Sequence, residues 1–192
     1  MTGDRREGFT GMVRRSLDLL YLGAGWLAGL FLISIFALMM GLSIGRQVGL
    51  NIPSGDDFTS WAMAAMAFLG LAHTFKSGDM IRVELLFERF KGRIRQVMEI
   101  LCLSLALVMS GYFSWHATMM SWDSYRFFEY SQGVLAVPMW IPQIGYALGL
   151  IILTIAILDE LVIVLSGRKP TYEKPPATTA EEVVERALQS GV

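Results

Sequence analysis

Four long stretches of the chain contain no charged residue. They are Leu19–Gly45, Phe58–Phe75, Ile100–Trp122 and Tyr130–Leu158, which are 27, 18, 23 and 29 residues long. A bilayer core needs about 20 mostly apolar residues in a helix that rises about 1.5 Å per residue. The pattern therefore predicts an all-α membrane protein with four transmembrane helices. A membrane barrel is excluded, because its strands would alternate in segments of about ten residues.

Two prolines set the start of the fourth span. Pro138 and Pro142 lie inside a stretch that is longer than one span requires. If the helix begins near Met139, Pro142 falls among the first four positions, whose N–H groups have no partner within the helix. We therefore expect an extended approach over 130–137. The spans are placed at about 19–45, 58–75, 100–122 and 139–160, within a membrane domain of 19–166 that has a flank at 1–18 and a tail at 167–192.

The segment between the second and third spans carries its own apolar stripe. Its members are spaced four, three, four and three residues apart, and they are Val83, Phe87, Phe90, Ile94 and Val97. This period predicts an amphipathic helix over about 80–98, lying in the membrane interface. The stripe would face either lipid or a partner protein.

Charge gives the orientation and removes one class of partner. Lys and Arg number 14 in the N-terminal flank, the middle segment and the C-terminal tail together, against 2 in the other two loops. The positive-inside rule then places both termini and the middle segment in the cytoplasm. A net charge of −1 without a basic face gives no indication of nucleic-acid binding.

The charge-free spans also bear on chemistry. Ion paths and substrate sites in membranes usually contain ionisable residues, so we expect that this chain does not transport a solute alone. Cys102 is the single cysteine, which excludes a disulfide framework within the chain. No catalytic residue, metal ligand or cofactor is expected.

Within the spans, the histidines are candidates for haem binding and the glycines for close helix packing. His73 and His116 differ by roughly 20 Å in expected depth, which is too far for both to hold one haem iron. Gly25 and Gly29, and Gly145 and Gly149, each share a helix face and allow close helix packing. Spans one and four should therefore pack tightly against other helices.

The stretch from Asp56 to Leu86 resembles the small membrane subunit of tripartite ATP-independent periplasmic (TRAP) transporters. That family shows an acidic pair, then F-L-G-x-A, then a basic-x-Gly-x-His-I-x-V-acidic signature, and a proline-aromatic opening of the last span. The matching residues are Asp56, Asp57, Phe68, Leu69, Gly70, Ala72, Lys76, Gly78, Ile81, Val83, Glu84, Pro138, Met139, Trp140 and Pro142. Met80 departs from the pattern, because it stands where the family often has histidine.

The resemblance implies a scaffold in the bacterial inner membrane. It would brace a large sodium-coupled permease subunit, while a periplasmic binding protein delivers an organic acid. Lys76 and Arg82 are expected at lipid headgroups, and Asp56 and Asp57 either cap the second span or dock a partner. The candidate partner or membrane-interface residues are Asp56, Asp57, Trp61, Gly70, Lys76, Gly78, Arg82, Glu84, Phe87, Phe90, Pro138 and Trp140.

The alternative function is a haem- or quinone-binding anchor subunit of a respiratory complex. A visible spectrum of the purified protein separates the two. We expect no Soret band, because the two histidines lie too far apart in depth to share an iron. A Soret band that copurifies with the chain would favour the anchor.

Overall fold

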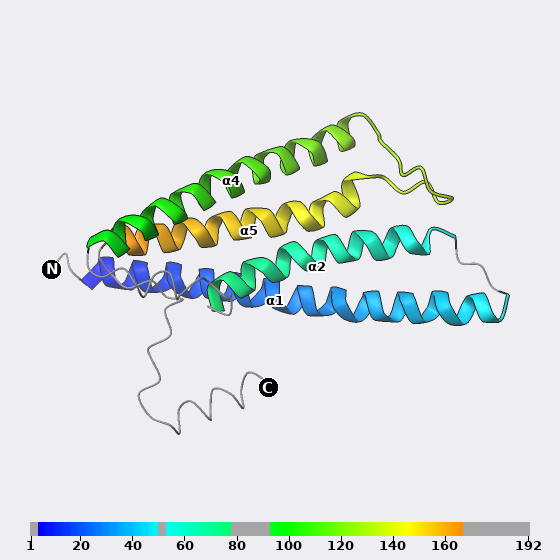
Figure 1. Cartoon of the computed structure of the whole chain (residues 1–192), viewed down its shortest axis with the longest axis horizontal. Coiled ribbons are helices and arrows are strands. Elements are labelled where there is room, and N and C mark those ends of the chain that lie inside the picture. The colour runs from blue at the N-terminus through cyan, green and yellow to red at the C-terminus, as the bar shows by residue number, and fades with distance from the viewer. Residues whose placement is uncertain (1–3, 50–52, 78–92, 167–192) are drawn as a thin grey trace, which may run out of the picture.

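A computed structural model describes residues 4–49, 53–77 and 93–166. Four antiparallel helices make up most of this part of the chain: α1 (Asp4–Gln47), α2 (Gly55–Ser77), α4 (Arg93–Arg126) and α5 (Trp140–Leu165). Each is long and apolar enough to cross a bilayer. The predicted all-α membrane fold with four spans is therefore confirmed (Figure 1).

The helices lie side by side in the order α1, α2, α5, α4 (Figure 1). The extensive contacts are those of α1 with α2, α2 with α5, and α5 with α4, whereas α1 touches α5 only slightly. Among the described residues α4 has no comparable contact with α1 or α2. We call the end of this row that holds Lys76 the inner end, following the predicted orientation, and the end that holds Asp56 the outer end.

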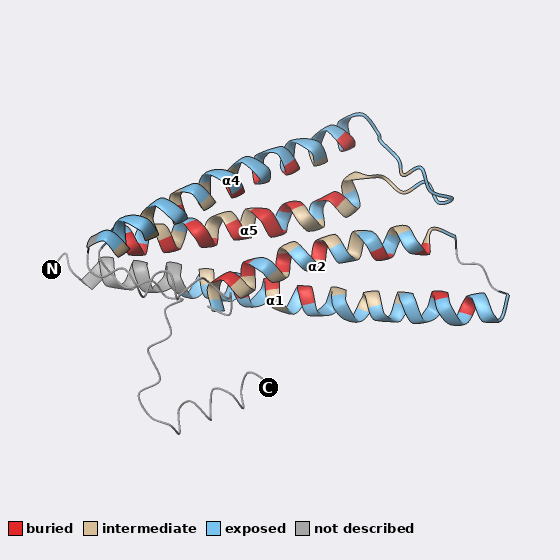
Figure 2. Ribbon diagram, viewed as in Figure 1, coloured by how far each residue is buried: buried red, intermediate tan, exposed pale blue. Residues whose placement is uncertain are grey.

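Burial follows from this order. Figure 2 shows buried residues along α2 and α5, while most of α1 and α4 is exposed. The largest core cluster lies toward the inner end and contains Tyr21, Ala72, Phe75, Leu103, Leu153, Ala156, Ile157 and Val164. All four helices contribute to it, so the row is joined most firmly there.

Glycines bring α2 and α5 into close contact. A Cβ added to Gly149 would lie 2.6 Å from the carbonyl carbon of Phe68, and one on Gly145 would lie 2.7 Å from the Cβ of Ala65. Gly25 of α1 likewise leaves room for the ring of His73. The expected tight packing of spans one and four is confirmed at these glycines. Gly29, by contrast, faces open space.

The outer loop between α4 and α5 is not helical. Tyr130 pairs with Pro138 in an isolated bridge, and the N–H of Ser131 donates to the carbonyl of Val137 at 2.8 Å. α5 begins at Trp140, which makes Pro142 its third residue. Pro142 is therefore harmless at the start of the helix, as predicted. The approach over 130–137 is not simply extended, because bends at 132–135 fold the segment back and bring Tyr130 to Pro138.

Helix ends differ from the charge-free windows. α1 begins at Asp4, within the predicted flank, and α4 begins at Arg93. Residues 93–98 of the predicted interfacial helix are thus the first turns of α4, which continues without a break from Arg93 into the third span. A transmembrane helix can continue past its apolar stretch, because its backbone hydrogen bonds form whether the side chains are apolar or polar. The rest of that predicted helix lies outside the described residues, as does the tail from 167.

We expect Gly149→Ala to destabilise the protein. The added methyl group meets the backbone of α2, and overpacking typically costs about 1–3 kcal/mol. Thermal unfolding of the purified chain in detergent measures the effect. Gly29→Ala is the matched control, since its methyl group meets nothing and alanine favours a helix by about 1 kcal/mol. Equal melting temperatures for the two variants would contradict the close packing.

Candidate functional site

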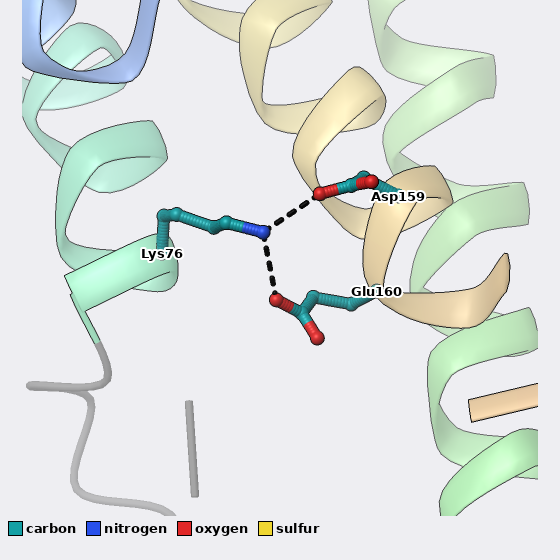
Figure 3. Close-up of polar contacts among 3 residues, drawn as sticks. All are labelled: Lys76, Asp159 and Glu160. Carbon is teal, nitrogen blue, oxygen red and sulfur yellow. Dashed lines mark hydrogen bonds and ion pairs between the residues drawn. The ribbon is translucent and has the colours of Figure 1, made fainter. Parts of the chain in front are cut away.

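A charged cluster connects α2 and α5 at the inner end of the row. The Nζ of Lys76 donates to Oδ2 of Asp159 at 2.7 Å and to Oε1 of Glu160 at 2.9 Å (Figure 3). The side chains of Lys76, Asp159 and Glu160 are 13%, 21% and 0% exposed. This set of three residues, the inner charge cluster, is the most buried group of charges among the described residues.

The local sequence explains the geometry of the inner charge cluster. Lys76 lies in the last turn of α2, and its long side chain reaches across to α5 (Figure 3). Asp159 and Glu160 are consecutive, so they point about 100° apart around α5 and flank the ammonium group from two sides. Residues 161–165, Leu-Val-Ile-Val-Leu, then continue the helix for more than one further turn.

Tyr21 brings α1 to the same place. Its ring centroid lies 5.5 Å from the Nζ of Lys76, and Nδ1 of His73 lies 3.1 Å from its carbonyl oxygen. The tyrosine is 2% exposed, and its hydroxyl has no hydrogen-bond partner among the described residues. Three helices therefore meet through polar contacts at one level of the row.

The energetics of the inner charge cluster depend on pairing. A buried charge without a partner costs several kcal/mol, because the interior does not solvate it as water does. Lys76 offsets part of this penalty, because its one positive charge lies beside two carboxylates of the neighbouring helix. The paired charges therefore suit a role in fixing α2 against α5.

The inner charge cluster bears on two expectations from the sequence. The position of Lys76 at lipid headgroups stays a prediction, and its ammonium group is bound between two carboxylates of α5. The membrane helices are also not free of charge, since the span that includes Asp159 and Glu160 runs to Leu165. Two features of the sequence indicate this cluster. They are the apolar run after Glu160, and Lys76 at the same end of the second span.

The predicted site residues at the outer end lie in three elements. Asp56 and Asp57 occupy the first turn of α2, and Asp56 pairs with Arg46 at 3.7 Å. Trp61 packs edge-on against Phe58, with ring centroids 5.2 Å apart.

The remaining outer residues belong to the loop and to α5. Pro138 pairs with Tyr130, and Trp140 contacts Tyr125 with centroids 5.8 Å apart.

The outer residues partly surround one cavity. It measures about 790 Å³ and is lined by Asp57, Trp61, Glu129, Tyr130, Ser131, Gln132, Gly133 and Met139. Ser54 links its two sides, because its Oγ accepts the N–H of Leu135 at 3.1 Å. The structure thus brings Asp57 and Trp61 to the α4–α5 loop, which sequence reasoning did not connect.

The other predicted residues lie between the inner and outer ends of the row, or outside the residues that the structure describes. Gly70 is in the middle of α2, and a Cβ there would make ordinary contact with Ala28. Five more lie outside the described residues: Gly78, Arg82, Glu84, Phe87 and Phe90.

The two histidines do not form a common site. His73 is held in the notch at Gly25 on α1, while His116 stacks on Tyr112 of α4 with centroids 4.4 Å apart. α5 lies between the helices that carry them (Figure 1). Among the described residues no group of His, Cys, Asp and Glu is arranged to hold a metal ion. The geometry gives no support to a haem shared by these histidines.

Comparison with known families identifies the chain. A sequence model of the DctQ component of tripartite ATP-independent periplasmic transporters matches residues 35–167. The chain belongs to this family. The match includes both carboxylates and the lysine of the inner charge cluster, so the cluster lies within the DctQ region. Searches of curated proteins and of solved structures gave no significant match.

Membership in the DctQ family carries three coarse conclusions. The protein is a multi-pass membrane protein and a TRAP transporter component of the small permease type. The family is a transporter component and not an enzyme family. DctQ proteins act together with a large permease component and a periplasmic component.

We expect Lys76→Met to destabilise the protein by about 3–5 kcal/mol, because it removes the ammonium group that pairs with two carboxylates of α5. Adding Asp159→Asn to this variant should recover part of the loss. Asp159→Asn alone should lower stability, so its effect changes sign with the lysine present or absent. Denaturation in detergent measures all four proteins.

The matched control for these variants is Asp56→Asn, which removes an exposed ion pair and should cost less than about 1 kcal/mol. If Lys76→Met were as mild as this control, the inner charge cluster would not hold α2 against α5.

Proposed function

We propose that this chain is a rigid scaffold for the large permease subunit of a TRAP transporter. The large subunit would carry substrate and sodium, and a periplasmic binding protein would deliver an organic acid. The complex would lie in the bacterial inner membrane, with both termini of this chain in the cytoplasm. In this arrangement the chain contributes packing surface and no transport chemistry.

The inner charge cluster is the observation that carries the proposal. Charges inside a span usually mark an ion path, a proton relay or a substrate site. Here the ammonium of Lys76 lies 2.7 and 2.9 Å from two carboxylates of α5, so each charge of the cluster has an opposite charge beside it within the chain. A charge that already has its partner on an adjacent helix favours a structural role.

Packing between α2 and α5 supports the same conclusion. At Gly149 the backbone of α5 approaches the backbone of α2 so closely that a methyl group would not fit. Interfaces of this kind do not slide gradually, because close-packed contacts allow few alternative arrangements. A helix pair fixed at its inner end by charge and farther along by two glycines, Gly145 and Gly149, suits a part that stays still while another subunit moves.

The outer edges of the row support a role in assembly. α1 and α4 expose many large apolar side chains, among them Trp26, Ile33 and Val108, which are 76%, 71% and 67% exposed. Lipid covers such surfaces in any membrane protein, and a large membrane partner covers part of them in a complex. The row therefore has more surface for a partner than a compact four-helix bundle would have.

The test is co-purification. The chain is tagged, expressed with the large permease and binding protein from neighbouring reading frames, and purified in mild detergent. We expect the large permease to copurify in about equal amount, because a scaffold has no function alone. Proteoliposomes should accumulate an organic acid only when this chain, the large permease, the binding protein and a sodium gradient are all present.

The control is the same chain purified alone into proteoliposomes, which should show no flux. If the chain purified without any large permease, or if it moved solute by itself, the scaffold proposal would be wrong.

A further inference from the structure

His116 lies at a depth where lipid offers no hydrogen bond. It is 16 residues from Ile100 and 6 residues from Trp122, the ends of the charge-free stretch of α4. At about 1.5 Å per residue these separations are about 24 and 9 Å, which places His116 inside a hydrocarbon core of about 30 Å. An imidazole at this depth needs a polar partner to offset its desolvation.

The ring of His116 does not turn toward the nearer membrane surface. It stacks on Tyr112, one turn closer to the inner end, with ring centroids 4.4 Å apart and planes 56° apart. Side chains on a helix lean toward its N-terminus, which for α4 is the inner end. The imidazole therefore points toward the middle of the bilayer, so snorkelling to the outer headgroups does not explain it.

The side chain of His116 is exposed, and it makes no hydrogen bond with any described residue. The small residues that pack α4 against α5 lie on a different face of the helix, and they are Ser110, Ser114, Ala117 and Ser124. His116 thus belongs to the side of α4 that faces away from the rest of the row.

The outward side of α4 forms one continuous stripe. Its members recur at spacings of three and four residues, and they are Leu101, Leu105, Val108, Tyr112, His116 and Met119. Leu105, Val108 and Tyr112 are 61%, 67% and 60% exposed. A stripe with this period is the pattern by which one helix packs into the groove of another protein. We call it the outer α4 stripe.

We propose that the outer α4 stripe is the surface that binds the large permease subunit, which supplies a hydrogen-bonding group to His116 within the membrane. This inference rests on the proposed function, because it takes the large permease to be the partner. Lipid tails have no such group. A periplasmic protein does not reach this depth. The occupant must therefore be a membrane protein with a polar side chain or an open backbone group at the level of His116.

Photocrosslinking tests the position of the partner. Tyr112 is replaced by p-benzoylphenylalanine in the chain expressed with the large permease and binding protein, and native membranes are irradiated. We expect an adduct with the combined mass of this chain and the large permease. An adduct with the mass of two copies of this chain would overturn the choice of partner. A complex that copurifies but gives no protein adduct from position 112 would overturn the surface.

Substitution tests the hydrogen bond. His116→Leu should reduce copurified permease about 3- to 10-fold, the range given by one hydrogen bond between membrane helices of about 0.6–1.4 kcal/mol. His116→Gln keeps a donor and an acceptor, so it should retain most of the partner. If the face contacted lipid, His116→Leu would leave the yield of complex unchanged or raise it, and the proposal would be wrong.

A folding control separates association from stability. Because His116 bonds no described residue, His116→Leu should leave the melting temperature of the isolated chain unchanged. A lowered melting temperature that matches the loss of permease would assign His116 a role in folding and overturn the proposal. If the unaltered chain bound no permease at all, the proposed scaffold function would be wrong. The two His116 variants do not test that function, so the unaltered chain is measured beside them.

Discussion

The ammonium group of Lys76 lies between two carboxylates of another span, and the order of the helices depends on that contact. Charges in a membrane helix are tolerated when an opposite charge lies within hydrogen-bonding distance, and this contact requires α2 and α5 to be neighbours. With these helices fixed at the centre, α1 packs on the free side of α2 and α4 on the free side of α5. Tyr21 and His73 add a polar contact that holds α1 at the same level.

A row of helices differs physically from a closed bundle. In a bundle each helix packs against two others, whereas here the edge helices α1 and α4 each have one extensive neighbour among the described elements. The edges therefore gain little internal packing, and their stability depends on lipid and on whatever protein lies beside them. This suits a DctQ component, whose family works within a larger membrane assembly. The central helices α2 and α5 are held rigidly together, while the edge helices α1 and α4 leave surface for a partner.

The sequence predicted the four spans, the non-helical approach to the last span and the close packing at Gly145 and Gly149. These follow from residue type and spacing alone, because bilayer thickness and glycine geometry impose strict local rules. It did not predict the inner charge cluster, because Asp159 and Glu160 lie at the end of the predicted span and nothing in the sequence places them beside Lys76. Helix order was also not predictable. Each span is apolar around most of its circumference, so the sequence alone does not show which helices of this chain pack together.

The inner charge cluster cannot form until the ribosome has made its carboxylates. Lys76 is made 83 residues before Asp159. At about 5–20 residues per second, the ribosome needs roughly 4–17 s to supply the acceptors. During that interval the second span holds a lysine whose partners do not yet exist, and lipid headgroups or water must solvate it. Insertion of α5 then ends this provisional state, because it supplies both carboxylates that bind Lys76.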